Sequence, residues 1–206
     1  MKITEITPQK NSDRVNIFID DEFSLGVSIF IAHEYSLKVG TTLSEDLLLK
    51  LRDHDNFSKA KNMAFRYLSY RDRSIKEMKD YLLKKDYGPD IIELTISYLI
   101  DKEFLDDHRF AVNFIEGKSR NNGYGPRKIK YDLMNKGISK DIIATCLQDY
   151  DEDLDEIIEL VNKKYSRLKE ADYNKQYNTI GGFLSRKGHS YDVIKKVLDA
   201  FRNGVD

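Results

Sequence analysis

LLKKDYGPDII at residues 82–92 is followed by LMNKGISKDII at 133–143 and by LSRKGHSYDVI at 184–194, so one pattern returns every 51 residues. Lysine, aspartate and isoleucine recur at fixed places in this pattern, and the shared lysines are Lys85, Lys136 and Lys187. A constant spacing of this size, without a gap, is typical of repeated supersecondary units. The sequence therefore predicts three copies of one unit, stacked so that each buries its apolar face against a neighbour.

Helix start and stop signals divide each copy into three helices. Residues 74–77, Ser-Ile-Lys-Glu, form a capping box, in which Ser74 and Glu77 each accept a hydrogen bond from the other residue's backbone amide. Pro89 and Pro126 suit the first turn of a helix, and Gly137 and Gly188 suit left-handed helix ends. We therefore expect a mainly α fold, with three tandem three-helix, helix-turn-helix-like repeats in an elongated curved array.

The first 56 residues or so follow a different period. Val15–Ile19 and Phe23–Val27 alternate apolar with other residues on either side of an acidic turn, which predicts a β-hairpin. Ile3–Ile6 is a candidate third strand, and short helices are expected from 28 to 35 and from 44 to about 53. The expected domains are an N-terminal α+β cap at 1–56 and three repeats at 57–102, 103–150 and 151–206.

Composition limits the classes of function. Of the residues, 40% are hydrophobic and 33% are charged, while the net charge is −1 and the pI is about 6.5. No bulk positive field draws such a chain onto nucleic acid, so any such binding must come from a local surface. Cys146 is the single cysteine, which excludes an intrachain disulfide, and no run of about 18 apolar residues occurs. We expect a soluble cytoplasmic protein.

The residues offer no pattern for catalysis or for a cofactor. The four histidines do not cluster, and His189 takes the repeat position of Tyr87 and Ile138, which favours a packing role over metal binding. Three aspartates from Asp151 onward imitate a calcium loop, but Glu156 stands where that loop needs glycine. We expect no catalytic residue, no metal and no cofactor.

The remaining candidates for function are basic residues at equivalent positions of the repeats. Lys76 matches Arg127, and Lys79 matches Lys130, at the same 51-residue offset. Such positions are expected to align as a basic track facing an acidic protein surface or a phosphate backbone, although each lysine alone is also consistent with an ordinary solvated surface. The track consists of Arg71, Arg73, Lys76, Lys79, Lys84, Lys85, Arg127, Lys128, Lys130, Lys136, Arg186 and Lys187.

Four local patterns, in this order, resemble one known family. They are ITEI, QK and RVNIFIDDEF within residues 3–23, AFRYLSYRDRSIKE at 64–77, LDDHRFA at 105–111, and GPRKI with LMNKGI between 125 and 138. With these patterns the chain resembles the RecX family of recombination regulators over nearly its whole length. Asp86, where the later repeats have glycine, and His189, where an aromatic residue is more usual, depart from the family pattern.

The resemblance implies a non-enzymatic protein that binds the RecA recombinase filament on single-stranded DNA. Family members lie along the helical groove of that filament, where they block its extension and restrain its ATPase, strand-exchange and coprotease activities in DNA repair and the SOS response. We also expect a monomer with no membrane association, and allow for weak direct DNA binding, although the sequence leaves the oligomeric state open.

Two other functions stay open on the sequence alone. A general DNA-binding helical-repeat protein, acting independently of RecA, is the main alternative, because three-helix units resemble helix-turn-helix modules. Near-neutral charge argues against it, and a steep salt dependence of DNA binding would favour it. An unrecognised hydrolase is the third hypothesis, and metal- or nucleotide-dependent turnover would support it.

Overall fold

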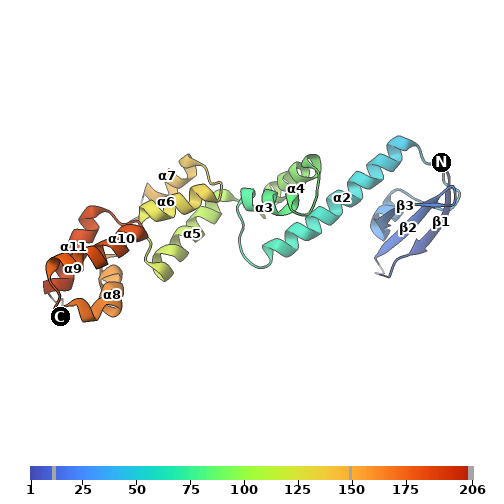
Figure 1. Ribbon diagram of the computed structural model, residues 1–206. Coiled ribbons are helices and arrows are strands. Elements are labelled where there is room, and N and C mark those ends of the chain that lie inside the picture. Colours follow the sequence, from blue (N-terminus) through green and yellow to red (C-terminus); the bar gives the residue numbers. More distant parts are fainter. Residues whose placement is uncertain (11–12, 149, 204–206) are drawn as a thin grey trace. The chain divides into compact units, whose positions relative to one another are not determined.

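The computed structural model describes residues 1–10, 13–148 and 150–203 of the 206-residue chain. It contains two compact units, one made of residues 1–72 and 78–104 and the other of residues 73–77 and 105–206. Figure 1 shows a small sheet near the N-terminus and helices through the rest of the described chain. The predicted fold class, mainly α-helical with three-helix repeats after an N-terminal α+β region, is confirmed.

The N-terminal sheet has three antiparallel strands in the order β1-β2-β3. They are β1 (Ile3–Pro8), β2 (Arg14–Ile19) and β3 (Glu22–Ser28). Asp20 and Asp21 join β2 to β3 with φ values of 51° and 67°, as a two-residue hairpin turn of the primed type requires. The predicted hairpin and its third strand are therefore both present.

One face of the sheet is covered by helices. Ile17 and Val27 are fully buried, and they share a core with Ile31 of α1 (Ile29–Glu34) and with Leu51. The hydroxyl of Ser28 accepts a hydrogen bond from the amide of Ile31, which fixes the start of α1 directly after β3.

Helix α2 (Glu45–Leu68) differs from the prediction, because it is one helix of 24 residues instead of two. Ser44 caps it as expected, but the predicted end near Asp53 is wrong. No glycine or proline interrupts this stretch, and the polar run around Asp55 is held by a buried ion pair, with Arg14 at 2.9 Å and Lys59 at 2.7 Å. Burial tends to raise the pKa of Asp55, but hydrogen bonds from Arg14 and Lys59 outweigh it and leave that pKa lowered.

The C-terminal half of α2 packs on α4 (Pro89–Asp101) in the first unit. Phe57 contacts Tyr98 edge to face, with ring centroids 5.9 Å apart. Tyr67 stacks at 4.0 Å on Tyr81 of α3 (Ile75–Leu83), a helix whose first residues, 75–77, belong to the second unit. Aromatic pairs therefore join the three helices of this region.

The second unit contains two further three-helix groups. The first group is α5 (Asp107–Asn122), α6 (Pro126–Asn135) and α7 (Lys140–Gln148), which bury a shared core that includes Ile129 and Leu133. Pro126 opens α6, Gly137 has a φ of 82° just after it, and Ser139 accepts from the amide of Ile142, all as predicted.

The other group replaces one regular helix with a composite. Its elements are α8 (Leu154–Tyr165), the short 3₁₀ turn η1 (Ser166–Leu168), α9 (Tyr173–Gln176), the π-helical turn η2 (Tyr177–Gly181), α10 (Gly182–Lys187) and α11 (Tyr191–Asn203). Gly188 ends α10 with a φ of 91°, as predicted. None of the described helices is long and apolar enough to cross a membrane.

Candidate functional site

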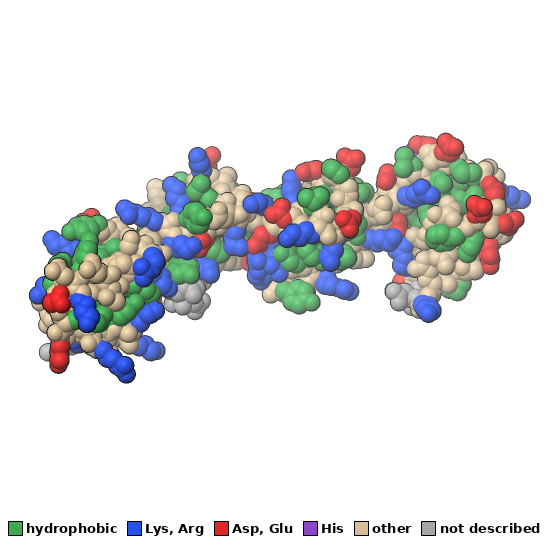
Figure 2. All heavy atoms as spheres, in the orientation of Figure 1, with side chains coloured by type: hydrophobic (Ala, Val, Ile, Leu, Met, Phe, Trp, Pro, Cys, Tyr) green, Lys and Arg blue, Asp and Glu red, His purple; other side chains and the backbone are tan. Residues whose placement is uncertain are grey.

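The residues of the predicted basic track are divided between the two units. Those in the first unit are Arg71, Lys79, Lys84 and Lys85, and those in the second are Arg73, Lys76, Arg127, Lys128, Lys130, Lys136, Arg186 and Lys187. On the face shown in Figure 2, Lys and Arg side chains are prominent over the C-terminal helices, while Asp and Glu side chains are frequent near the N-terminal sheet. Positive charge is thus distributed unevenly along a chain of nearly zero net charge.

Several track lysines are paired with local carboxylates. The ammonium group of Lys79 lies 2.6 Å from Glu93, that of Lys128 lies 2.7 Å from Asp132, and that of Lys136 lies 2.6 Å from Glu77. Each of these three ammonium groups therefore already has a carboxylate partner, and the Lys136–Glu77 pair is the most buried of the three. By contrast, Arg127, Lys130 and Arg186 have exposed side chains in the second unit.

The start of α3 and the end of α6 meet at what we call the first junction, within the second unit. Ser74 donates its hydroxyl to the carbonyl of Lys136 at 2.7 Å, and Lys76 donates to the carbonyl of Asn135 at 3.0 Å. Gly137 lies so close that a Cβ there would be 2.6 Å from the Cβ of Lys76. The capping box between Ser74 and Glu77 is present, with N···O distances of 3.1 and 3.3 Å, and it positions Glu77 to bind Lys136.

The start of α6 and the end of α10 meet at the second junction, where backbone amides take the place of the side-chain donors. The amide of Gly125 donates to the carbonyl of Lys187 at 2.9 Å, and that of Arg127 donates to the carbonyl of Gly188 at 3.3 Å. A Cβ on Gly188 would be 2.3 Å from the backbone nitrogen of Lys128. Residues 125, 127, 187 and 188 lie 51 positions after residues 74, 76, 136 and 137, so the repeat in the sequence is also a repeat of the contact.

Charge distinguishes the two junctions. The position of Glu77 in the first junction is held by Lys128 in the second, 51 residues later. At the second junction the ammonium of Lys187 lies 4.5 Å from the ring centre of Tyr124 and 5.5 Å from that of Phe183. The carboxylate that neutralises Lys136 is therefore replaced, at the equivalent position, by another cation.

Two more lysines approach the same aromatic rings. Lys118 lies 5.4 Å from the ring centre of Tyr124, and Lys164 lies 4.5 Å from that of Phe183. We call Lys118, Lys164 and Lys187 the lysine cluster. Burial lowers the pKa of Lys187, and the positive charges of Lys164 and Lys118 lower that pKa further. The repeat pattern does not predict this grouping, because Lys164 is on the first helix of its repeat and not on the helix that carries the track.

His189 is buried beside the second junction, as the expected packing role requires. Its exposed fraction is 2%, and its ring nitrogens lie 2.5 Å from a carboxylate oxygen of Glu152 and 3.1 Å from the carbonyl of Gly123. The polar contacts were not predicted, because Glu152 and Gly123 are distant from His189 in sequence. His189 thus ties the segment before α8 to the end of α5.

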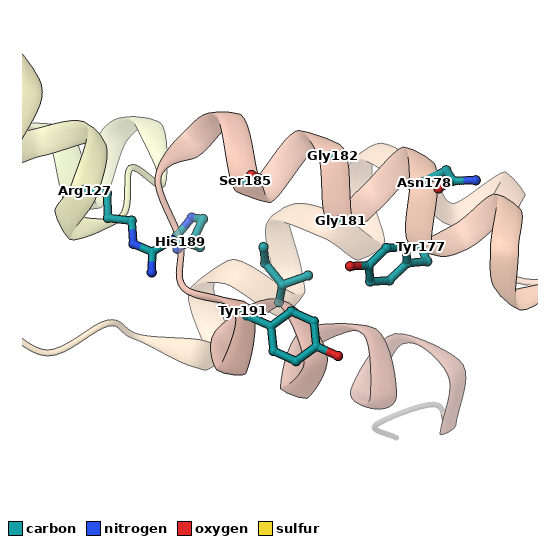
Figure 3. Close-up of a pocket in the computed structure, with 9 residues that line it drawn as sticks. Arg127, Tyr177, Asn178, Gly181, Gly182, Ser185, His189 and Tyr191 are labelled. Atoms are coloured by element: carbon teal, nitrogen blue, oxygen red, sulfur yellow. The ribbon is translucent and has the colours of Figure 1, made fainter.

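A pocket of about 310 Å³ lies on another face of α10 (Figure 3). Arg127 and His189 are at one end of it, and Tyr177 and Asn178 of the π-helical turn are at the other. A π-turn often marks a functional position in a helix. The pocket offers one cation, aromatic rings and amide groups, but among the described residues no group of His, Cys, Asp and Glu side chains is suited to a metal ion.

Comparison with known protein families gives four matches, in order along the chain. Residues 1–44 match the model described as the regulatory protein RecX N-terminal domain. Residues 60–99, 106–147 and 151–198 match the first, second and third three-helix domains of RecX.

Individual relatives agree with these matches. The chain is 35% identical over 204 residues to the regulatory protein RecX of Clostridioides difficile, covering 98% of this chain and 96% of the relative. It is 33% identical over 200 residues to the regulatory protein RecX of Bacillus subtilis, covering 96% and 76%.

Two solved structures are also similar. The crystal structure of RecX from Lactobacillus salivarius is 31% identical, with a TM-score of 0.65 over 72% of this chain and 97% of that one. A crystal structure of regulatory protein RecX, 24% identical, has a TM-score of 0.74 over 96% and 98%, which supports the fold.

Proposed function

This chain belongs to the RecX family of regulatory proteins, and we propose that it binds the RecA recombinase filament on single-stranded DNA and restrains its activities. The restrained activities are ATP hydrolysis, strand exchange and coprotease function, in DNA repair and the SOS response. We further propose that the protein acts by occupancy, without catalysis, as a cytoplasmic monomer.

The observation that carries this proposal is the sequence of four family matches from residue 1 to residue 198. A shared fold alone would not assign a function, because helical repeats serve many functions. Identity of 35% over 98% of the chain to a regulatory protein of this family adds support at the level of the whole molecule. The proposed domain ranges, 1–56, 57–102, 103–150 and 151–206, follow the same order, although residues 11–12, 149 and 204–206 lie outside the described part.

The structure supports the proposal by exposing cations on a repeated framework. The two junctions hold the start of α3, both ends of α6 and the end of α10, through side-chain donors in the first junction and backbone amides in the second. Arg127, Lys130 and Arg186 are exposed on this framework and are suited to ionic contacts with an acidic protein surface or with phosphates. Lys76, Lys128 and Lys136 have structural partners instead, so we give them the smaller share of binding.

Cosedimentation tests the proposal directly. RecA filaments assembled on single-stranded DNA, and the same DNA without RecA, are pelleted with the protein over a range of salt concentrations. We expect the protein to pellet with the filament at salt concentrations that release it from naked DNA. Equal or tighter retention on naked DNA would instead favour the general DNA-binding function.

A charge-reversal variant locates the contact. Arg127→Glu with Lys130→Glu should weaken filament binding, whereas Lys195→Glu with Lys196→Glu, which changes the charge equally on exposed positions of α11, should not. Lys76 is left unchanged because its side chain covers Gly137 in the first junction. Equal filament binding by both variants would remove the α6 face from the proposed interface.

A further inference from the structure

The lysine cluster contains positive charge that the predicted track does not account for. Lys187 is the single residue shared between them, and Lys118 and Lys164 come from α5 and α8. Three separate helical elements of the second unit, α5, α8 and α10, thus bring their ammonium groups to the rings of Tyr124 and Phe183.

The rings hold the lysines in place. Lys118 lies between Phe114, at 5.5 Å from its ring centre, and Tyr124, at 5.4 Å. Lys164 lies between Tyr165, at 5.7 Å, and Phe183, at 4.5 Å. Cation–π contacts of this kind orient an ammonium group without neutralising its charge. The result is a ladder in which lysines and aromatic rings alternate across the second unit.

Like charges gathered in this way repel one another. Within the described part of the chain, neither Lys118 nor Lys164 forms an ion pair with a carboxylate. The lowered pKa of Lys187 is the expected consequence of burial beside two cations. A bound anion would relieve this repulsion, and so the cluster is arranged for a ligand with more than one negative charge.

We propose that Lys118, Lys164 and Lys187 form a binding site for closely spaced phosphate groups, such as those of a nucleic-acid single strand or of a polyphosphate. Lysine binds phosphate as a point charge, and basic residues interleaved with aromatic rings are the usual surface for single strands. The biological meaning of this site rests on the proposed function, because a RecA filament contains single-stranded DNA, but its test needs this chain alone.

The test is a fluorescence-anisotropy titration of a labelled oligothymidylate with the full chain. The Lys118→Gln/Lys164→Gln/Lys187→Gln variant should bind at least about tenfold more weakly, the loss expected for one charge-assisted hydrogen bond. Its plot of log affinity against log salt should be shallower by about 2, because each phosphate on a single strand contributes roughly 0.7 to that slope.

A matched control keeps the charge change equal. Lys140→Gln/Lys195→Gln/Lys196→Gln removes three exposed lysines from α7 and α11 and should bind like the unchanged chain. Lys187→Arg should also keep its affinity, because it keeps the charge. Circular dichroism checks that every variant is folded. Equal binding by the cluster variant and the unchanged chain, or an equal loss in the control, would overturn the proposal.

Competition identifies the source of the phosphates. Stronger competition per phosphate by unlabelled oligothymidylate assigns the site to a nucleic-acid strand, and stronger competition by tripolyphosphate assigns it to a free polyphosphate. Failure of both to compete contradicts the site. Loss of oligonucleotide binding in a variant that still pellets with RecA filaments would support the site while placing the filament contact elsewhere. If the unchanged chain fails to pellet with filaments, but its DNA binding still depends on the cluster, the proposed function fails and the site stands.

Discussion

The first and second junctions join equivalent residues of the repeats but have opposite charge relations. The hydrogen bonds of the first come from the side chains of Ser74 and Lys76, and those of the second come from backbone amides. In each, a glycine with positive φ at the end of one helix, Gly137 or Gly188, lies against the start of another. In the first, Glu77 neutralises Lys136, whereas in the second the equivalent pair is Lys128 and Lys187. The comparison shows that the repeat preserves a close approach at the glycine, whereas the atoms that meet it, the hydrogen-bond donors and the charges around it differ.

The largest expected effect comes from filling the glycine contacts. Gly188→Ala should lower the free energy of unfolding by about 2–5 kcal/mol, because left-handed strain and overpacking add. Gly137→Ala should cost less, about 1–3 kcal/mol, since its Cβ would meet atoms of the Lys76 side chain and not a backbone nitrogen. Urea unfolding measures both.

Gly117→Ala is the control for that pair, because a Cβ there meets nothing within 4 Å and the residue lies inside α5. It should be neutral or stabilising by up to about 1 kcal/mol. A larger loss for Gly137→Ala than for Gly188→Ala would contradict the geometric distinction between the junctions.

The next effect concerns the polar contacts of the second junction. His189→Ile installs the residue type that the first junction has at the equivalent position, where Ile138 is 4% exposed. We expect a loss of about 2–3 kcal/mol, since Glu152 and the Gly123 carbonyl lose their partner. Thermal unfolding measures it, and adding Glu152→Gln should recover part of the loss. No loss in the single variant would show that the ring serves only to fill space.

Removing one charge from each junction gives a smaller effect. Glu77→Gln should cost about 1–2 kcal/mol, because it leaves the half-buried Lys136 without its carboxylate. Lys128→Gln should cost less than about 0.5 kcal/mol, since Lys128 and Asp132 form an i, i+4 pair on one helix. Chemical denaturation of both variants checks the order, and the reverse order would mean that the charge of Lys128 is structural.

The smallest effect is a pH dependence of Lys187. Its pKa is lowered in the folded chain, so the folded chain releases this proton at a lower pH than the unfolded chain does. The free energy of unfolding should therefore rise with pH between the lowered pKa and 10.5. Near neutral pH, Lys187→Met should therefore leave the free energy of unfolding unchanged or raise it by less than about 0.5 kcal/mol. The difference from the unchanged chain should shrink in alkali.

Lys136→Met provides the contrast for that measurement, because it removes the partner of Glu77 and should destabilise the chain near neutral pH. Thermal unfolding at several pH values compares the two variants. A Lys187→Met variant that is destabilised near neutral pH, with a deficit that shrinks as the pH rises, would contradict the expected sign.

Much of the fold could be predicted from local signals. The capping box at Ser74 and the glycines at 137 and 188 each act within a few residues, and the structure has the helix ends that they predict. The 51-residue period then places the same signals in each repeat. The continuous α2 was missed because its central polar segment is held by Arg14, a residue 41 positions before Asp55. The π-turn at Tyr177–Gly181 has no periodic signature and was missed for that reason.

The candidate site was less predictable. Equivalence within the repeat identified Lys136 and Lys187 as a pair but could not show that a carboxylate faces one and cations face the other. That difference depends on residues 77 and 128, and on Lys118 and Lys164, which meet Tyr124 and Phe183 through tertiary packing alone. Sequence alone therefore predicted where positive charge recurs, and the structure was needed to show which lysines gather at shared aromatic rings.

The proposed restraint of RecA is best measured by ATP hydrolysis. RecA is preassembled on single-stranded DNA, and the rate is followed after this protein is added at far less than one molecule per RecA. We predict a gradual fall in the rate at these low ratios, because a few molecules that block filament extension affect many subunits. An unchanged rate even at equimolar protein, together with direct binding to naked DNA, would contradict it.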